Sequence, residues 1–240
     1  FREYERFSTA ILNAFLQPKV GRYMSRLEDA LSHRVGRAAI GISQSAGGLM
    51  DIQRASRFPI RTALSGPAAG VAGATRVALR AGFPRAIAFD IGGTSTDVCL
   101  IENAAAAMSY GRDVAEFPVR LPSIDIHTVG AGGGSIAHVG PDGLMKVGPR
   151  SAGAVPGPAC YGRGGTLPAV SDANVVLGRL PASLVGGGMT LDRDKAVEAI
   201  APLAKHFGLS IEEAALGIVR ITASNIVRAI RAVSVERGHD

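Results

Sequence analysis

Residues 86–101 read Ala86-Ile-Ala-Phe-Asp-Ile-Gly-Gly-Thr-Ser-Thr-Asp-Val-Cys-Leu-Ile101. Two apolar runs, 86–89 and 98–101, flank a polar centre that contains a pair of glycines. Each run has the length and composition of a buried strand, and a glycine pair is typical of a tight reversal between two strands. The stretch therefore predicts a β-hairpin, and the rest of the chain is organised around it.

The turn of this hairpin carries the donors that a phosphate site needs. Gly92 and Gly93 leave the backbone bare, so that N–H groups can approach an anion closely. Three hydroxyl groups follow directly, on Thr94, Ser95 and Thr96. We therefore expect these five residues to bind the phosphates of a nucleotide.

Two carboxylates stand at the ends of the turn, Asp90 before it and Asp97 after it. A carboxylate at such a position can hold a phosphate-bound Mg²⁺ directly or through water. We interpret the hairpin as the phosphate-binding hairpin of an ATPase, with Asp90 and Asp97 as catalytic residues and Asp90 as a metal ligand. The alternative is a glycine-rich β-turn whose hydroxyls are merely solvated.

Composition limits the classes of protein that fit. The chain has 240 residues, of which 47% are apolar and 19% charged, as expected for one large globular domain or two small ones. Its net charge is +6, but the basic residues are scattered and not interleaved with aromatic ones, so we expect no nucleic-acid partner. No apolar run reaches the length of a membrane span. The two cysteines, Cys99 and Cys160, lack metal-site spacing, which favours a reduced, cytoplasmic protein.

The pattern along the chain divides it into three segments, 1–83, 84–150 and 151–240. The first is helical: apolar residues recur at helical spacing over 6–33, where Pro18 is expected to kink the helix or begin a second one. A candidate strand covers 37–43, and a short helix ends near residue 58. A helix of small residues then runs from an N-cap at Ser65 to about residue 81. Such a thin helix either packs closely against a sheet or admits a ligand beside its N-terminus.

The second segment reads as β-structure beyond the hairpin. Residues 123–130 alternate, so Asp125 and His127 are expected on one face of one strand, where they could bind a divalent metal or act as a base and its partner. A structural role for this Asp-x-His pair is the alternative. His138 and Asp172 are further candidate ligands, although nothing in their spacing favours them. Residues 140–143 predict a hairpin turn.

The third segment begins with a loop rich in proline and glycine around residues 156–165, whose length and constrained composition are typical of functional loops. Ser171 is expected to cap a short helix that ends near residue 180, and another helix covers 192–207. Ser210 and Glu213 form a capping box for a last helix over 211–237.

The glycine-rich motifs exclude two common nucleotide sites. None of the elements 65–70, 90–97 and 130–135 carries the Gly-Lys-Ser/Thr of a Walker loop, and none fits Gly-x-Gly-x-x-Gly. Separate loops that supply backbone amides to one nucleotide are the better interpretation.

Several stretches together resemble the hydantoinase A / 5-oxoprolinase family. They cover nearly the whole chain in order, at residues 1–6, 64–71, 89–98, 125–135, 156–165, 172–174 and 233–240. The resemblance implies that the chain is a fragment of the central domain of such a protein. It also implies an incomplete α/β fold of the ribonuclease H-like type that actin, Hsp70 and sugar kinases share, with β-hairpins and long flanking helices.

The resemblance implies a function as well. Members of the family use ATP and Mg²⁺ to open a cyclic amide such as a hydantoin or 5-oxoproline, and carboxylase relatives use ATP to activate a ketone. They work with a hydantoinase B-type subunit or domain, in an oligomer. On this basis Gly132, Gly133, Gly134 and Ser135 are expected to line the nucleotide cleft. The isolated chain lacks two nucleotide elements of the family, so a non-catalytic nucleotide-binding module is the alternative.

Overall fold

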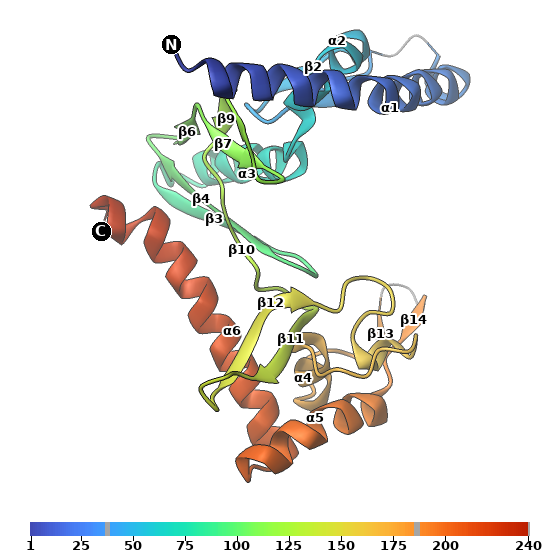
Figure 1. Cartoon of the computed structure of the whole chain (residues 1–240), viewed down its shortest axis with the longest axis vertical. Coiled ribbons are helices and arrows are strands. Elements are labelled where there is room, and N and C mark those ends of the chain that lie inside the picture. Colours follow the sequence, from blue (N-terminus) through green and yellow to red (C-terminus); the bar gives the residue numbers. More distant parts are fainter. Residues whose placement is uncertain (37–38, 185–187, 240) are drawn as a thin grey trace. The chain divides into compact units, whose positions relative to one another are not determined.

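The computed structural model describes residues 1–36, 39–184 and 188–239, and it divides into two compact units (Figure 1). Unit 1 contains Phe1–Ala88 and Cys99–Ile126. Unit 2 contains Phe89–Val98 and His127–Asp240. Both strands of the predicted hairpin contribute residues to each unit, whereas the turn between them belongs to unit 2. The division of the chain into the segments 1–83, 84–150 and 151–240 remains a prediction.

Unit 1 is built on one long helix. Helix α1 (Glu3–Val35) continues without a break through Pro18, so the alternative in which this proline begins a second helix is wrong. It packs against α2 (Ile52–Arg57) and the 3₁₀ helix η1 (Pro59–Thr62). Met24 of α1 is buried in this small core together with residues that precede and form α2: Met50, Ile52 and Ala55.

The other apolar side chains of α1 are less buried than their helical spacing suggests. Tyr4, Phe7, Ile11 and Phe15 are exposed, and Phe15 is 77% exposed. With Phe117 they line a groove of about 480 Å³. Helical periodicity therefore predicted the helix but not the burial of this face.

Helix α3 (Ser65–Arg80) is the predicted helix of small residues. Its N-cap is Leu64 rather than Ser65, because the left-handed backbone at Leu64 (φ 59°) ends the preceding segment and Ser65 is already helical. Ala68 and Val71 pack into a core with Cys99, Ile124 and Ile126 from the β-rich part of the chain that follows. This contact supports the close-packing role that the sequence left open.

Short antiparallel strands complete unit 1. They are β1 (Ile42–Ser43) with β2 (Leu49–Met50), β6 (Met108–Ser109) with β9 (Ser123–Ile124), β7 (Arg112–Val114) with β8 (Phe117–Val119), and β5 (Ala105–Ala106) beside β4. The candidate strand over 37–43 is thus reduced to Ile42–Ser43 among the described residues, since residues 37–38 lie outside them.

The predicted hairpin consists of β3 (Ala86–Ile91) and β4 (Thr96–Glu102), and β10 (His127–Val129) pairs antiparallel with β4. Strand β4 is central and buries Val98, Cys99 and Ile101. Strand β3 lies at the edge of this sheet, and its Phe89 is 58% exposed. The expectation of two buried strands is therefore confirmed for β4 and wrong for β3.

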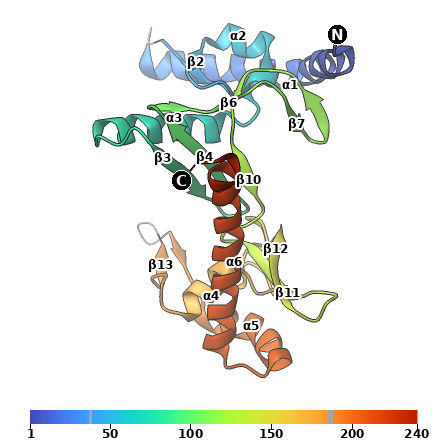
Figure 2. The ribbon, with the colours of Figure 1, turned by 90° about the vertical axis from the view of Figure 1, so that its left-hand side faces the viewer.

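Unit 2 continues with a second hairpin and then helices. Strands β11 (Ser135–Val139) and β12 (Met145–Ser151) flank the predicted turn at 140–143, where the Gly143 N–H donates to Gly140 O. The remaining elements are η2 (Ala159–Tyr161), α4 (Val170–Val176), β13 (Ser183–Leu184), β14 (Met189–Thr190), α5 (Arg193–Phe207), α6 (Ile211–Val233) and η4 (Val235–Arg237). Helix α6 contacts β10 and β12 along its length (Figure 2).

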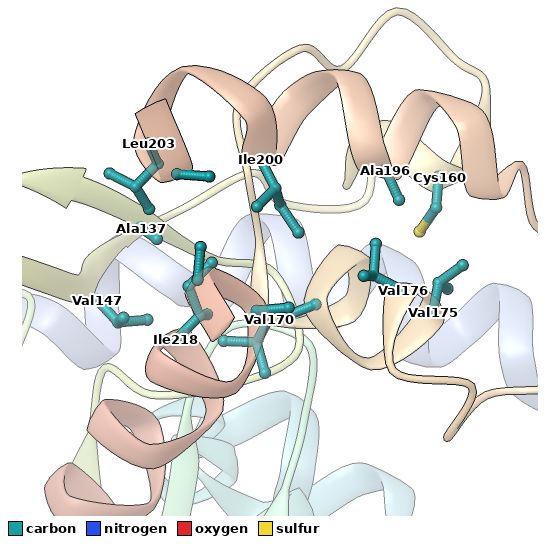
Figure 3. Packing of buried hydrophobic residues seen from close by; sticks show 14 of the residues in the cluster. Ala137, Val147, Cys160, Val170, Val175, Val176, Ala196, Ile200, Leu203 and Ile218 are labelled. Carbon is teal, nitrogen blue, oxygen red and sulfur yellow. The ribbon is translucent and has the colours of Figure 1, made fainter. Parts of the chain in front are cut away.

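The core of unit 2 lies where α4, α5 and α6 meet (Figure 3). Val170 and Val176 of α4 face Ile200 of α5 and Ile218 of α6, and all four side chains are buried. The capping box is confirmed: the Ser210 N–H donates to Glu213 Oε2 (2.8 Å) and the Glu213 N–H to Ser210 Oγ (3.2 Å). Helix α6 ends at Val233, four residues before the predicted end, where a 3₁₀ turn follows.

Candidate functional site

The turn between β3 and β4 is an open loop of backbone and hydroxyl donors. It is closed by a hydrogen bond from the Gly92 N–H to Ser95 O (2.9 Å). Within the described ranges, the N–H groups of Gly93, Thr94 and Ser95 donate to no carbonyl or side chain. The hydroxyls of Thr94 and Ser95 make no hydrogen bond to these ranges either. Gly92, Gly93 and Thr94 are exposed. Adjacent free N–H groups with neighbouring hydroxyls form a concavity suited to an anion such as phosphate.

A second glycine-rich turn supports this hairpin from one side. The Gly133 N–H donates to Gly92 O (3.0 Å) and the Gly134 N–H to Gly93 O (2.6 Å). The Gly132 N–H donates to Ser135 Oγ (2.9 Å), and the Ser135 N–H returns to Gly132 O (3.0 Å). All four amides are therefore already used, which leaves none of them for a phosphate in this conformation.

Glycine is required in this second turn because the two backbones approach so closely. A Cβ at Gly132 would lie 2.6 Å from Gly92 O, and one at Gly134 would lie 2.9 Å from Gly93 O. Real Cβ atoms do not approach that closely, so any other residue would displace the hairpin. The structure thus brings residues 132–135 to the hairpin, as expected, but in a supporting position.

Thr96 and Asp97 also hold the hairpin in place. The Thr96 side chain is buried, and its hydroxyl donates to Ala131 O (2.5 Å), so the prediction that it faces a nucleotide lacks structural support. Asp97 is half-buried, and its Oδ1 accepts from Thr128 Oγ1 (2.5 Å) on the neighbouring strand β10. Its carboxylate is oriented, which suits a water-mediated metal contact better than free rotation would.

The remaining carboxylate of the turn, Asp90, is exposed at the end of β3 beside the free donors. It is the residue of the predicted site whose carboxylate is most accessible to a cation. Its role as a metal ligand stays a prediction.

The proposed Asp-x-His pair does not share a strand. Ser123–Ile124 and His127–Val129 are separate strands, β9 and β10, and Asp125 lies between them, so the premise of one common face is wrong. The Asp125 N–H donates to Ala107 O in unit 1, while His127 belongs to unit 2. Among the described residues, no group of three or more His, Cys, Asp or Glu side chains could hold a metal ion. His138 is exposed on β11.

Asp172 has a structural role that its sequence position did not reveal. Its side chain is completely buried. Oδ1 accepts from the Cys160 N–H (2.7 Å), and Oδ2 accepts from the N–H groups of Ala169 (2.8 Å) and Ala159 (3.3 Å). The carboxylate thus fixes the proline- and glycine-rich loop to the start of α4, which begins at Val170 with Ala169 as N-cap instead of Ser171. It is unavailable as a metal ligand.

The thiol of Cys160 lies against this carboxylate. Burial, followed by the hydrogen bond and the charge of Asp172, raises the pKa of Cys160 well above its usual value of 9.0. Because the thiolate is the reactive form of cysteine, this residue is an inert part of the core. Cys99 is buried as well, and neither cysteine forms a disulfide.

Comparison with known proteins places the chain in a family. Residues 6–240 match the family described as Hydantoinase/oxoprolinase. The chain belongs to the hydantoinase/oxoprolinase family. The resemblance seen in the sequence motifs is thereby confirmed.

Relatives within this family act on different substrates. Caprolactamase subunit alpha of Pseudomonas jessenii is 42% identical over all of this chain and 35% of its own length. The 5-oxoprolinase of Saccharomyces cerevisiae is 34% identical over 98% of this chain and 19% of its own length. A nucleotide-free acetone carboxylase structure, from work on ATP-dependent acetone carboxylation, superposes over the whole chain and 34% of its own with a TM-score of 0.87 and 30% identity.

These relatives define what the family shares. They are named as a caprolactamase, a 5-oxoprolinase and an acetone carboxylase, and the caprolactamase relative is named as a subunit. The mixed α/β fold is that of ATP-dependent enzymes of this family. The chain spans about a third of the length of the caprolactamase subunit. No helix among the described residues has both the length and the hydropathy of a membrane span.

Proposed function

We propose that this chain is the phosphate-binding part of an ATP-dependent enzyme that opens cyclic amides. The open turn at residues 92–95 carries this proposal, because its free N–H groups at Gly93, Thr94 and Ser95 and its two hydroxyls are the donors that a triphosphate needs. The ATP-dependent relatives support it. On this proposal the fold is the ribonuclease H-like type, and the turn is one of its phosphate hairpins.

Within the site, each residue has a separate role. The N–H groups of Gly93, Thr94 and Ser95 and the hydroxyls of Thr94 and Ser95 bind phosphate oxygens. Asp90 orders Mg²⁺, and Asp97, fixed by Thr128, orients its water ligands. Transfer of the nucleotide's phosphoryl group to the amide oxygen would make the amide carbon open to attack by water. The ring nitrogen would then leave as the amine, and the resulting acyl phosphate would be hydrolysed to carboxylate and phosphate. The protein contributes mainly positioning and electrostatic stabilisation.

The wider assignments are part of the same proposal. The partner is a hydantoinase B-type subunit or domain, supported by relatives that are subunits of larger enzymes. The assembly is an oligomer and works in the cytoplasm, which suits two buried cysteines that form no disulfide.

Ketone carboxylation is the second candidate. The acetone carboxylase structure supports it, since the whole chain superposes on that protein with a TM-score of 0.87. An assay of the intact protein with Mg-ATP and either cyclic amides or ketones plus bicarbonate separates the two reactions. Ring opening without bicarbonate supports the first, and bicarbonate-dependent ATP use supports the second.

Substitution of Thr94 tests the phosphate role directly. We expect Thr94→Val in the intact protein to lower ATP turnover about 100-fold, the typical cost of removing one preorganised donor at a reacting group. Asp90→Asn should lower it by a similar factor and raise the Mg²⁺ requirement. Both side chains are exposed, so the fold should remain intact.

The matched control is Ser224→Ala, which removes an exposed hydroxyl from α6 in the same unit. Its turnover should equal that of the unmodified protein. Normal ATP turnover in the Thr94→Val protein would contradict the proposal that this turn binds phosphate.

A further inference from the structure

A cleft of about 330 Å³ lies in unit 2 between the end of β12 and the proline- and glycine-rich loop. Its polar lining includes Arg150, Ser151 and Thr166. Its apolar lining includes Ile136, Val155 and Leu167. No role in the phosphate site uses these six residues.

The loop that forms one wall of this cleft is fixed from behind. The buried carboxylate of Asp172 binds the N–H groups of Ala159, Cys160 and Ala169, as described above. The two walls are also joined directly, because the Gly157 N–H donates to Ala152 O (3.2 Å). A loop with three buried amides on one carboxylate keeps its shape, so the cleft is a built feature of the fold.

The polar side chains that line the cleft can bind an anion. Arg150 is exposed, and none of the described carboxylates forms an ion pair with it. Ser151 Oγ accepts from the Gly153 N–H (3.1 Å), which leaves its own proton free to donate. The Thr166 hydroxyl is exposed and makes no hydrogen bond within the described chain. A guanidinium with neighbouring hydroxyl donors binds a carboxylate through two parallel hydrogen bonds.

The apolar side chains that line the cleft favour a hydrocarbon group. Ile136 is buried, with 5% of its surface exposed, whereas Val155 and Leu167 are 81% and 41% exposed. Exposed aliphatic side chains gain from contact with a ligand's methylene groups. Inorganic phosphate would use the hydrogen-bond donors of the cleft but not these aliphatic side chains.

We propose that the cleft is a binding site for a small organic carboxylate, with Arg150 holding the carboxylate and Leu167 and Val155 contacting the hydrocarbon part. Two backbone hydrogen bonds connect this cleft to the turn at residues 92–95. The Ala152 N–H donates to Gly134 O (2.8 Å), and the Gly134 N–H donates to Gly93 O (2.6 Å). The proposal that the cleft binds a carboxylate does not depend on the proposed function. Only the inference that the cleft lies near a reacting phosphate rests on that function.

Calorimetric titration of the intact protein without nucleotide tests the proposal, with acetate, hexanoate, hexanamide and inorganic phosphate as probes. Hexanoate should bind more tightly than acetate, and hexanamide about tenfold more weakly than hexanoate, because it lacks the charge. Arg150→Ala should weaken hexanoate binding about tenfold or more, and Arg150→Lys less. Leu167→Ala should weaken hexanoate but leave acetate unchanged.

Arg163→Ala is the matched control, since Arg163 is an exposed arginine of the same loop that does not line the cleft. It should bind hexanoate like the unmodified protein. Equal hexanoate affinity in Arg150→Ala, or phosphate binding as tight as hexanoate binding, would overturn the proposal. Because no probe is a nucleotide, such a failure leaves the ATP-turnover experiment on Thr94 unaffected.

Discussion

At the scale of single residues, Asp172 has the clearest structural role, because its one side chain joins two segments of unit 2. One carboxylate satisfies three backbone N–H groups from two segments, which otherwise would be buried without partners. Bonds from charged acceptors are stronger than neutral ones, and an unsatisfied buried donor is costly. The result is a loop of defined shape in a region rich in glycine.

Asp172→Asn tests this role with almost no change in volume. The amide places an NH₂ donor against an N–H donor, so at least one buried group loses its partner. We expect the free energy of unfolding to fall by about 1–3 kcal/mol. Denaturant unfolding of the intact protein measures it. Exposed Asp194→Asn, in the first turn of α5, is the control and should change stability little. Equal midpoints for the two variants would contradict the role of Asp172.

The raised pKa of Cys160 predicts a pH dependence of stability. The unfolded thiol ionises near the usual value of 9.0, whereas the folded thiol stays protonated at higher pH. The contribution is therefore complete below pH 9.0 and is lost as the pH rises above it. Relative to Cys160→Ala, the unmodified protein should lose up to about 1.4 kcal/mol of stability per pH unit.

Equilibrium unfolding at several pH values from neutral to alkaline measures this difference. A second readout is alkylation: native Cys160 should resist iodoacetamide and react fully in denaturant. Rapid labelling of Cys160 in the native protein, with no alkaline loss of stability, would show that the thiol is not held as described.

At the scale of elements, the central feature is the contact between two glycine-rich turns. The turn at 132–135 donates two N–H groups to the carbonyls of Gly92 and Gly93, which holds the hairpin through its carbonyls and leaves its N–H groups at residues 93–95 without a partner among the described residues. The site is thus made by one element that presents donors and a second that holds it. Only close approach of bare backbones allows this arrangement.

Gly134→Ala tests this division of roles. Its Cβ would lie 2.9 Å from Gly93 O and 2.8 Å from Ser151 Oγ, so the hairpin must shift. We expect the affinity for Mg-ATP to fall about tenfold or more, with a smaller effect on the rest of the fold. Titration of the intact protein with Mg-ATP measures the affinity.

The matched control is Gly217→Ala inside α6 of the same unit, where the new Cβ meets Met145 Sδ at an ordinary 3.5 Å. A glycine-to-alanine change in a helix interior should stabilise the protein by about 0.5–1 kcal/mol and leave nucleotide affinity unchanged. If Gly134→Ala behaves like this control, the supporting contact is not needed.

At the scale of the whole molecule, local sequence patterns predicted which helices, strands and turns form, but not which of their faces are buried. The β3–β4 hairpin, the turn at 140–143 and the Ser210–Glu213 capping box depend on residues close in sequence, and all three are confirmed. The exposure of β3 and of the Phe15 face of α1 depends on which segments pack on them, which spacing does not encode.

The candidate site shows the same limit. The residues 92–95 were recognisable because bare backbone and hydroxyls are a local signal. The supporting role of residues 132–135 was not, since a glycine that binds phosphate and a glycine that touches another backbone look alike in sequence. Asp172 was named only as a further candidate ligand, and its structural role was missed because its three partners lie 3, 12 and 13 residues away and only folding brings them together.

The central claim is that the open turn of the β3–β4 hairpin binds the phosphates of ATP. Hydrogen exchange of the intact protein with and without Mg-ATP, resolved to single amides, tests it most directly. Exchange should slow at Gly93, Thr94 and Ser95 when Mg-ATP is added. It should change little at Gly133 and Gly134, which are already hydrogen-bonded. Unchanged exchange at Gly93, Thr94 and Ser95 in protein saturated with Mg-ATP would contradict the claim.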